Sequence, residues 1–130
     1  MHLAAKEHTL VPRTVTVVPA GCHMVVTPDA HARLVTSGGF PPNRPSADLL
    51  LSTMGVSLGA RAIAVVLSGC GRDAATGATV IHEFGGTVLA ADPDCTEHPS
   101  MPTEAIGRDE VVDHVLAPRD IAAFLVKLTT

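Results

Sequence analysis

The stretch from Ala62 to Gly77, AIAVVLSGCGRDAATG, decides the fold. Residues 62–67 form an unalternating apolar run, which is typical of a parallel strand that is covered on both faces. A glycine turn follows at once, and the pattern from about Asp73 to Phe84 predicts a helix. A strand that passes directly into a glycine turn and a helix is the first part of a βαβ unit. The stretch therefore predicts a parallel sheet.

The flanking sequence extends the same alternation of strands and helices. Downstream, a glycine pair ends the helix, a β-rich run predicts the next strand, and a proline opens a C-terminal helix. Upstream, Ser46 is a good N-cap for a helix with Asp48 in its first turn, and two short β-rich runs flank a Pro-Asp turn that predicts a hairpin. The predicted strands are 14–18, 23–27, 32–36, 62–67, 87–91 and 111–116, and the predicted helices are 47–58, 73–84, a short turn at 104–106, and 118–128.

The length of 130 residues suits one domain, so we expect a single domain over residues 1–130. The order of its elements predicts an α/β fold. Its core would be a partial doubly wound, mostly parallel sheet with helices on its faces, preceded by an N-terminal β-hairpin.

The charge balance excludes several classes of partner. Nine Lys and Arg against thirteen Asp and Glu give a formal net charge of −4, and no basic cluster occurs, so a nucleic-acid or membrane-surface partner is not expected. Aromatic residues make up 2% of the chain, which argues against stacking on bases. No run approaches the roughly 20 apolar residues needed to span a bilayer, and the N-terminus has no signal-peptide core. We therefore predict a cytoplasmic protein.

The three cysteines are Cys22, Cys70 and Cys95. Their odd number and wide spacing fit free thiols in a reducing compartment better than disulfides. Cys22 and His23 are neighbours that would point to opposite faces of a strand, and no CxxC or HxxxH spacing occurs. We expect no metal site.

The turn after residue 67 lies where α/β sheets place their sites, outside the carboxyl end of a strand. Three interpretations of Asp73 remain open here. Asp73 caps the helix that follows while the glycines only turn the chain. Alternatively, the turn binds a nucleotide, although Ala74 departs from the GxGxxG pattern. In the third interpretation Asp73 orients a catalytic histidine, and the amides of the turn stabilise an oxyanion.

Five blocks of sequence match, in order, the motifs of one known family. They are Val17–Met24 (VVPAGCHM), similar to APGDRHM; Asn43–Leu50 (NRPSADLL), similar to RPSVDVLF; Leu67–Ala75 (LSGCGRDAA), similar to LTGMGADGA; Gly85–Asp92 (GGTVLAAD), similar to GGxTIAQD; and Met101–Ile106 (MPTEAI), similar to MPxAAI. From about Lys6 to Leu128 the chain resembles the C-terminal part of the CheB-type protein-glutamate methylesterase domain of bacterial chemotaxis.

The resemblance implies a doubly wound α/β domain that hydrolyses γ-glutamyl methyl esters on chemoreceptors with a Ser-His-Asp triad and no cofactor. It makes Asp73 the triad acid. It assigns to Cys70, which stands where the family has Met, the backbone amide of an oxyanion hole. His23 matches a family position outside the triad and is expected near the mouth of the site, whereas His8 has no motif context.

The departures from the family pattern bear on activity. The family's nucleophile lies in a GASTGG turn and its catalytic histidine in a QHM turn, both upstream of the matched blocks, and the 130 residues contain neither motif. The family's receiver domain is also absent from them. Residues 37–39 (SGG) are only superficially similar to the nucleophile turn, because they follow the HM element instead of preceding it. Relative to the family, Ala74 and Ser100 replace glycines, and the polar loop 95–99 is expected to repack poorly.

The resulting hypothesis is a truncated CheB-like methylesterase that is inactive alone, because an acid cannot run acyl transfer without a nucleophile and a base. Truncation would leave an unpaired sheet edge and an apolar face, which favour association. The expected partners are a methylated chemoreceptor or another methyl-esterified protein, and a separately encoded N-terminal half or a second copy. The alternative is a non-catalytic remnant or interaction module.

Overall fold

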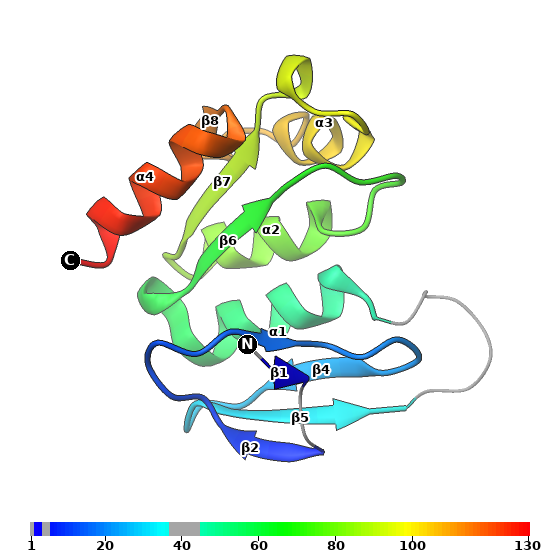
Figure 1. Ribbon diagram of the computed structural model, residues 1–130, viewed down its shortest axis with the longest axis vertical. Helices are drawn as coiled ribbons and strands as arrows, with labels where there is room; N and C mark the ends of the chain where they lie inside the picture. The colour runs from blue at the N-terminus through cyan, green and yellow to red at the C-terminus, as the bar shows by residue number, and fades with distance from the viewer. Residues whose placement is uncertain (1, 4–5, 37–44) are drawn as a thin grey trace.

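The computed structural model describes residues 2–3, 6–36 and 45–130 (Figure 1). The strands are β1 (His2–Leu3), β2 (Glu7–Thr9), β3 (Thr16–Val17), β4 (His23–Val26), β5 (His31–Val35), β6 (Ile63–Val66), β7 (Thr87–Ala91) and β8 (His114–Leu116). The helices are α1 (Ala47–Leu58), α2 (Ala75–Glu83), α3 (Ser100–Ile106) and α4 (Pro118–Leu128), with short 3-10 helices η1 (Gly59–Arg61) and η2 (Pro93–Cys95).

The predicted parallel sheet is formed by β6, β7 and β8 in that order. In the first pair, Ile63 lies opposite Thr87 and Val66 lies opposite Ala90. The chain crosses from β6 to β7 through α2, and from β7 to β8 through α3. Because the strands are parallel, their carboxyl ends share one edge of the sheet, and the glycine turn after β6 lies at that edge.

Helices cover both faces of this sheet, as the doubly wound prediction requires. On one face, Ala64 of β6 packs in a cluster with Ala78 and Ile81 of α2, all of them fully buried. On the other face, α4 buries Ile121 against Leu89 of β7. The α/β fold class is therefore confirmed.

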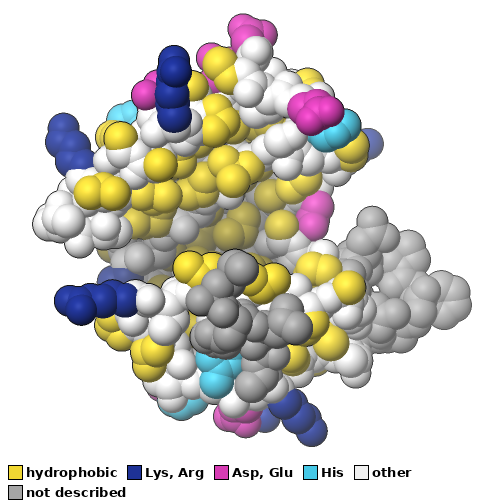
Figure 2. All heavy atoms as spheres, viewed as in Figure 1, with side chains coloured by type: hydrophobic (Ala, Val, Ile, Leu, Met, Phe, Trp, Pro, Cys, Tyr) yellow, Lys and Arg dark blue, Asp and Glu magenta, His cyan; other side chains and the backbone are white. Residues whose placement is uncertain are grey.

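The expectation that β6 is covered on both faces is only half right. Ala64 and Val66 are buried on the α2 side, whereas Ile63 and Val65 on the α4 side are half-buried and Leu67 is 50% exposed. Among the described residues, β6 pairs with β7 on one side and with no strand on the other. Figure 2 shows hydrophobic side chains gathered over the face where β6, β7 and α4 lie toward the viewer.

The last strand is shorter than predicted, because it begins at His114 rather than at residue 111. Asp113 supplies the physical reason. Its N–H donates to Val88 O at 2.8 Å, and its Oδ2 accepts the Val88 N–H at 2.7 Å. The side chain thus occupies the acceptor position of a strand carbonyl, and Val111 before it packs into the cluster on the α2 side.

An antiparallel sheet in the order β2-β5-β4 contains the predicted hairpin of β4 and β5. The strand β2, which the sequence does not predict, places His8 opposite Ala32 of β5. The strand β3 is shorter than the predicted 14–18: it spans two residues and pairs in parallel with β1.

In the hairpin turn between β4 and β5, the Thr27 hydroxyl donates to Asp29. This hydrogen bond is the main cause that holds the pKa of the Asp29 carboxyl below its usual range.

The helix α1 lies between the antiparallel sheet and α2, and it has the bounds that the sequence predicts (Figure 1). Toward the sheet, Thr53 Oγ1 accepts the Val26 N–H at 3.0 Å, and the Ser57 hydroxyl donates to Val26 O at 2.8 Å. Toward α2, Gly55 of α1 and Gly77 of α2 each face the backbone of the other helix. This close approach brings together the N-terminal ends of both helices.

Candidate functional site

Asp73 lies in the turn after β6, at the carboxyl edge of the parallel sheet. The helix α2 begins at Ala75, two residues later than the predicted start, because the N-cap residue Ala74 has a left-handed φ of 94°. The Asp73 carboxylate does not bond to the amides of α2. The interpretation that it caps the following helix is therefore wrong.

The Asp73 carboxylate instead caps α1, which precedes it by about 25 residues. Oδ2 accepts the Ala47 N–H at 2.7 Å. Oδ1 accepts the Asp48 N–H at 2.8 Å and the Ser46 hydroxyl at 3.3 Å. First-turn amides have no partner within their own helix, and the helix dipole favours a negative charge there. Three donors therefore hold a half-buried carboxylate in one orientation.

Asp48 makes the reciprocal contact. Its Oδ1 accepts the Ala74 N–H at 2.9 Å and the Gly77 N–H at 2.8 Å, so the first turn of α1 caps α2 while Asp73 caps α1. We refer to these two contacts as the crossed caps. From the sequence, Asp48 is expected only to be a favourable charge in the first turn of α1. Its place in the motif similar to RPSVDVLF was the signal that could have singled it out.

Ser46 and His23 extend this network, and the arrangement differs from a catalytic triad. His23 is 2% exposed, and its Nδ1 accepts the Ser46 N–H at 3.1 Å. The Ser46 hydroxyl donates to Asp73 and accepts the Leu49 N–H. It does not donate to the imidazole, as the hydroxyl of a triad nucleophile would. His23 is therefore buried beneath the N-terminus of α1, where it contacts Ser46, a hydrogen-bond partner of Asp73.

The backbone strain at Ala74 gives a prediction about stability. Ala74→Gly relieves the strain of the left-handed conformation, which costs a non-glycine residue about 1–2 kcal/mol. It also removes one buried methyl group, whose burial stabilises the fold by about 0.8 kcal/mol. Glycine also makes the unfolded chain more flexible, at a cost of about 0.5–1 kcal/mol, so the three effects nearly cancel. We expect the free energy of unfolding, measured by urea denaturation, to change by less than about 0.8 kcal/mol in either direction.

The matched control is Ala75→Gly at the adjacent, fully buried first residue of α2. There the same methyl group is lost without any relief of strain, so we expect a loss of about 1–2 kcal/mol. Equal effects of the two substitutions would show that the φ of Ala74 is not strained.

The candidate oxyanion donor, the Cys70 N–H, lies between two amides that are already engaged. Gly69 N–H donates to His98 O at 2.8 Å, and Gly71 N–H donates to Ser100 Oγ at 3.0 Å. Within the described ranges, no group accepts the Cys70 N–H, and the residue is exposed. Gly71 has a φ of 89°, a conformation that suits glycine. Among the described residues, the Cys70 N–H is therefore one of the amides of this turn that have no acceptor, and it lies on an exposed residue at the end of β6.

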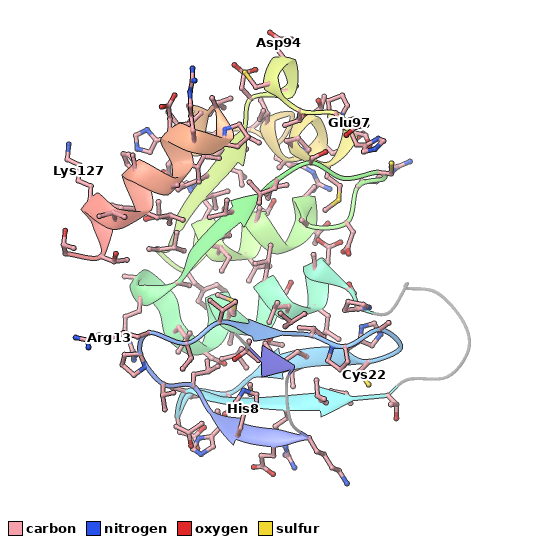
Figure 3. All side chains as sticks on the ribbon, in the orientation of Figure 1. His8, Arg13, Cys22, Asp94, Glu97 and Lys127 are labelled. Atoms are coloured by element: carbon pink, nitrogen blue, oxygen red, sulfur yellow. The ribbon has the colours of Figure 1, made fainter. Side chains whose placement is uncertain are left out.

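The polar loop before α3 packs against this turn, contrary to the expectation that it repacks poorly. The Ser68 hydroxyl donates to His98 O at 3.3 Å and accepts the His98 N–H at 3.0 Å. Figure 3 shows Asp94 and Glu97 of the same loop at the end of the molecule where α3 lies. Hydrogen bonds to the His98 backbone hold this polar loop against the turn.

Other candidate sites receive less support. Residues 37–39 lie outside the described residues. The Ala74 and Gly77 amides that a nucleotide phosphate would use are taken by Asp48. In the described part of the chain, no three His, Cys, Asp or Glu side chains gather where they could hold a metal ion. Cys22 lies on the antiparallel-sheet side of the molecule (Figure 3).

Both the sequence and the structure of the chain are similar to known proteins. A family model described as CheB methylesterase matches residues 1–125. The chain belongs to this family. It is 39% identical over 103 residues to the protein-glutamate methylesterase FrzG of Myxococcus xanthus, a match that covers 79% of this chain and 31% of FrzG. It is 34% identical over 129 residues to protein-glutamate methylesterase/protein-glutamine glutaminase 3 of Paramagnetospirillum magneticum, covering 99% of this chain and 36% of that protein.

The structure is similar to the crystal structure of the Thermotoga maritima CheB methylesterase catalytic domain. The TM-score is 0.87 at 27% sequence identity, and the match covers 96% of this chain and 67% of that one. The chain therefore spans about a third of the length of these curated relatives and about two-thirds of the solved CheB domain. None of the helices in the described ranges has the length and apolar character that crossing a bilayer requires.

Proposed function

We propose that this chain contributes the acid and one oxyanion donor to the hydrolysis of protein γ-glutamyl methyl esters, and that it is inactive until a segment with a serine and a histidine completes the site. The observation that carries this proposal is the placement of Asp73 and the free Cys70 amide together after β6. The substrate would be a methylated chemoreceptor or another methyl-esterified protein, encountered in the cytoplasm.

The unpaired side of β6 indicates where a segment that carries the serine and the histidine would bind. A strand added there in parallel would end at the same edge of the sheet as β6. The turn after such a strand would lie beside the turn that holds Cys70 and Asp73. The half-buried Ile63 and Val65 would be covered by the added segment. That segment could belong to the same polypeptide, to a separate chain or to a second copy.

The bonding of Asp73 is compatible with the role of a triad acid. Two carboxylate oxygens offer about four acceptor positions, and the α1 cap uses three of them. One position remains on a half-exposed side chain for an imidazole N–H. A carboxylate that is already fixed by backbone amides would hold the imidazole in one tautomer and orientation.

In the completed site, the added serine attacks the ester carbonyl while the added histidine takes the hydroxyl proton. Asp73 stabilises the imidazolium, and the Cys70 N–H stabilises the oxyanion. Methanol leaves with the proton from the imidazolium, and water then releases glutamate by the same steps.

The test is methanol release from methylated receptor. We expect none from the 130-residue chain alone, and measurable release after it is mixed with, or fused to, a family segment that carries the GASTGG and QHM turns. In the active complex, Asp73→Asn is expected to lower kcat by about 10³–10⁴-fold, because the amide cannot stabilise the imidazolium.

Asp92→Asn is the matched control, because Asp92 also accepts a backbone N–H at the start of a short helix, from Asp94 at 2.9 Å, but in η2. It is expected to leave kcat unchanged. Methanol release by the chain alone, or equal effects of the two substitutions, would contradict the proposal. A folded complex without hydrolysis would favour the non-catalytic interaction module.

A further inference from the structure

The peptide group that joins Gly69 to Cys70 is held from its carbonyl side. Gly69 O accepts the Met101 N–H at 3.1 Å and the Ser100 hydroxyl at 3.0 Å. The same Ser100 oxygen accepts the Gly71 N–H at 3.0 Å. One hydroxyl therefore bridges the two residues on either side of Cys70.

These bonds fix the direction of the Cys70 N–H. A trans peptide group is planar, with its C=O and N–H on opposite sides. Holding Gly69 O toward the start of α3 therefore directs the Cys70 N–H away from α3. Hydrogen bonds accepted by the carbonyl also polarise the amide and make its N–H a stronger donor.

We infer that Ser100 is a positioning residue of the esterase site: with the Met101 amide, it orients and polarises the peptide group that presents the Cys70 N–H to the oxyanion. This inference rests on the proposed function. It concerns a residue that acts through Cys70 and has no contact with the substrate itself.

In the resemblance described above, Ser100 stands where the family motif has glycine, which has no hydroxyl. The close packing of the turn leaves little alternative support. A Cβ built on Gly69 would collide with Met101 Sδ, so the turn already lies against α3. The serine adds two hydrogen bonds without any added bulk on the turn itself.

The first measurement is amide hydrogen exchange by NMR in the 130-residue chain. Ser100→Ala removes the acceptor of the Gly71 N–H, so we expect the Gly71 amide to exchange about two- to tenfold faster. Ser100→Thr keeps a hydroxyl and is expected to restore slow exchange. Ser68→Ala is the control, because the Ser68 hydroxyl bonds only to the His98 backbone and leaves the partner of Gly71 in place.

The second measurement is kcat and KM of the completed esterase. Ser100→Ala is expected to lower kcat about three- to tenfold with KM unchanged, because the N–H matters most when charge develops on the oxygen. Ser100→Thr should restore kcat. A merely structural role would instead lower the amount of folded protein without altering kcat per folded site.

Unchanged Gly71 exchange in Ser100→Ala would overturn the inference, as would an unchanged kcat. If the wild-type complex releases no methanol, the proposed function fails. The exchange measurement then still decides whether Ser100 holds the turn.

Discussion

Gly77→Ala is expected to lower the free energy of unfolding by about 3 kcal/mol or more, which is the largest loss that we predict for a single methyl group in this chain. The added Cβ would lie 2.6 Å from Leu51 Cβ and 3.1 Å from the Asp48 Cα and carbonyl oxygen. These atoms belong to the backbone or are attached directly to it, so no side-chain rotation relieves the clash. The helices α1 and α2 would have to move apart, and the crossed caps would lengthen.

Gly107→Ala is the matched control for that substitution. Gly107 ends α3 with a φ of −68°, which suits any L-residue, and a Cβ there would meet nothing closer than Thr103 O at 3.4 Å. We expect no loss, or a gain of about 0.4–1 kcal/mol from the stiffer unfolded chain. Urea denaturation measures both variants. A loss below about 1 kcal/mol for Gly77→Ala would mean that the two helices are not in close contact.

Asp48→Ala is expected to cost about 2–4 kcal/mol, because it leaves the Ala74 and Gly77 amides without their acceptor at a part-buried helix start. Asp48→Asn keeps a carbonyl oxygen in the place of Oδ1 and should lose about half as much. The comparison separates the hydrogen bonds from the charge.

The control for Asp48 is Asp120→Ala. Asp120 also lies in the first turn of a helix, α4, but it is exposed, and in the described ranges its side chain accepts no hydrogen bond. Removal of a surface charge there should cost no more than about 0.5 kcal/mol. If chemical denaturation gives the same loss for both aspartates, then the crossed caps contribute nothing beyond the helix dipole.

Local sequence was sufficient for the elements whose ends are marked by their own residues. Ser46 caps α1 as predicted, and Pro118 opens α4 at the predicted residue, since caps and prolines act within one turn. The strand 87–91 was likewise predicted with its observed bounds, between a glycine pair and a polar loop.

The rest depended on contacts that are remote in sequence. No local pattern shows that Asp73 caps a helix that begins 26 residues earlier at Ala47, or that Asp48 returns the contact. The short strand β2 forms because β5 offers it an edge, and β8 begins late because Asp113 bonds to Val88 across the sheet. For the same reason the role of Ser100 could not be predicted, and the sequence alone presents it only as a departure from the family pattern.

The crossed caps also bear on how the molecule comes apart. α1 packs on the antiparallel sheet and α2 on the parallel sheet, and the start of each helix is completed by a carboxylate from the segment that begins the other. If the part that contains either helix unfolds, backbone N–H groups at the start of the other helix lose their acceptor. The two sheets should therefore melt as one cooperative unit rather than as separate subdomains.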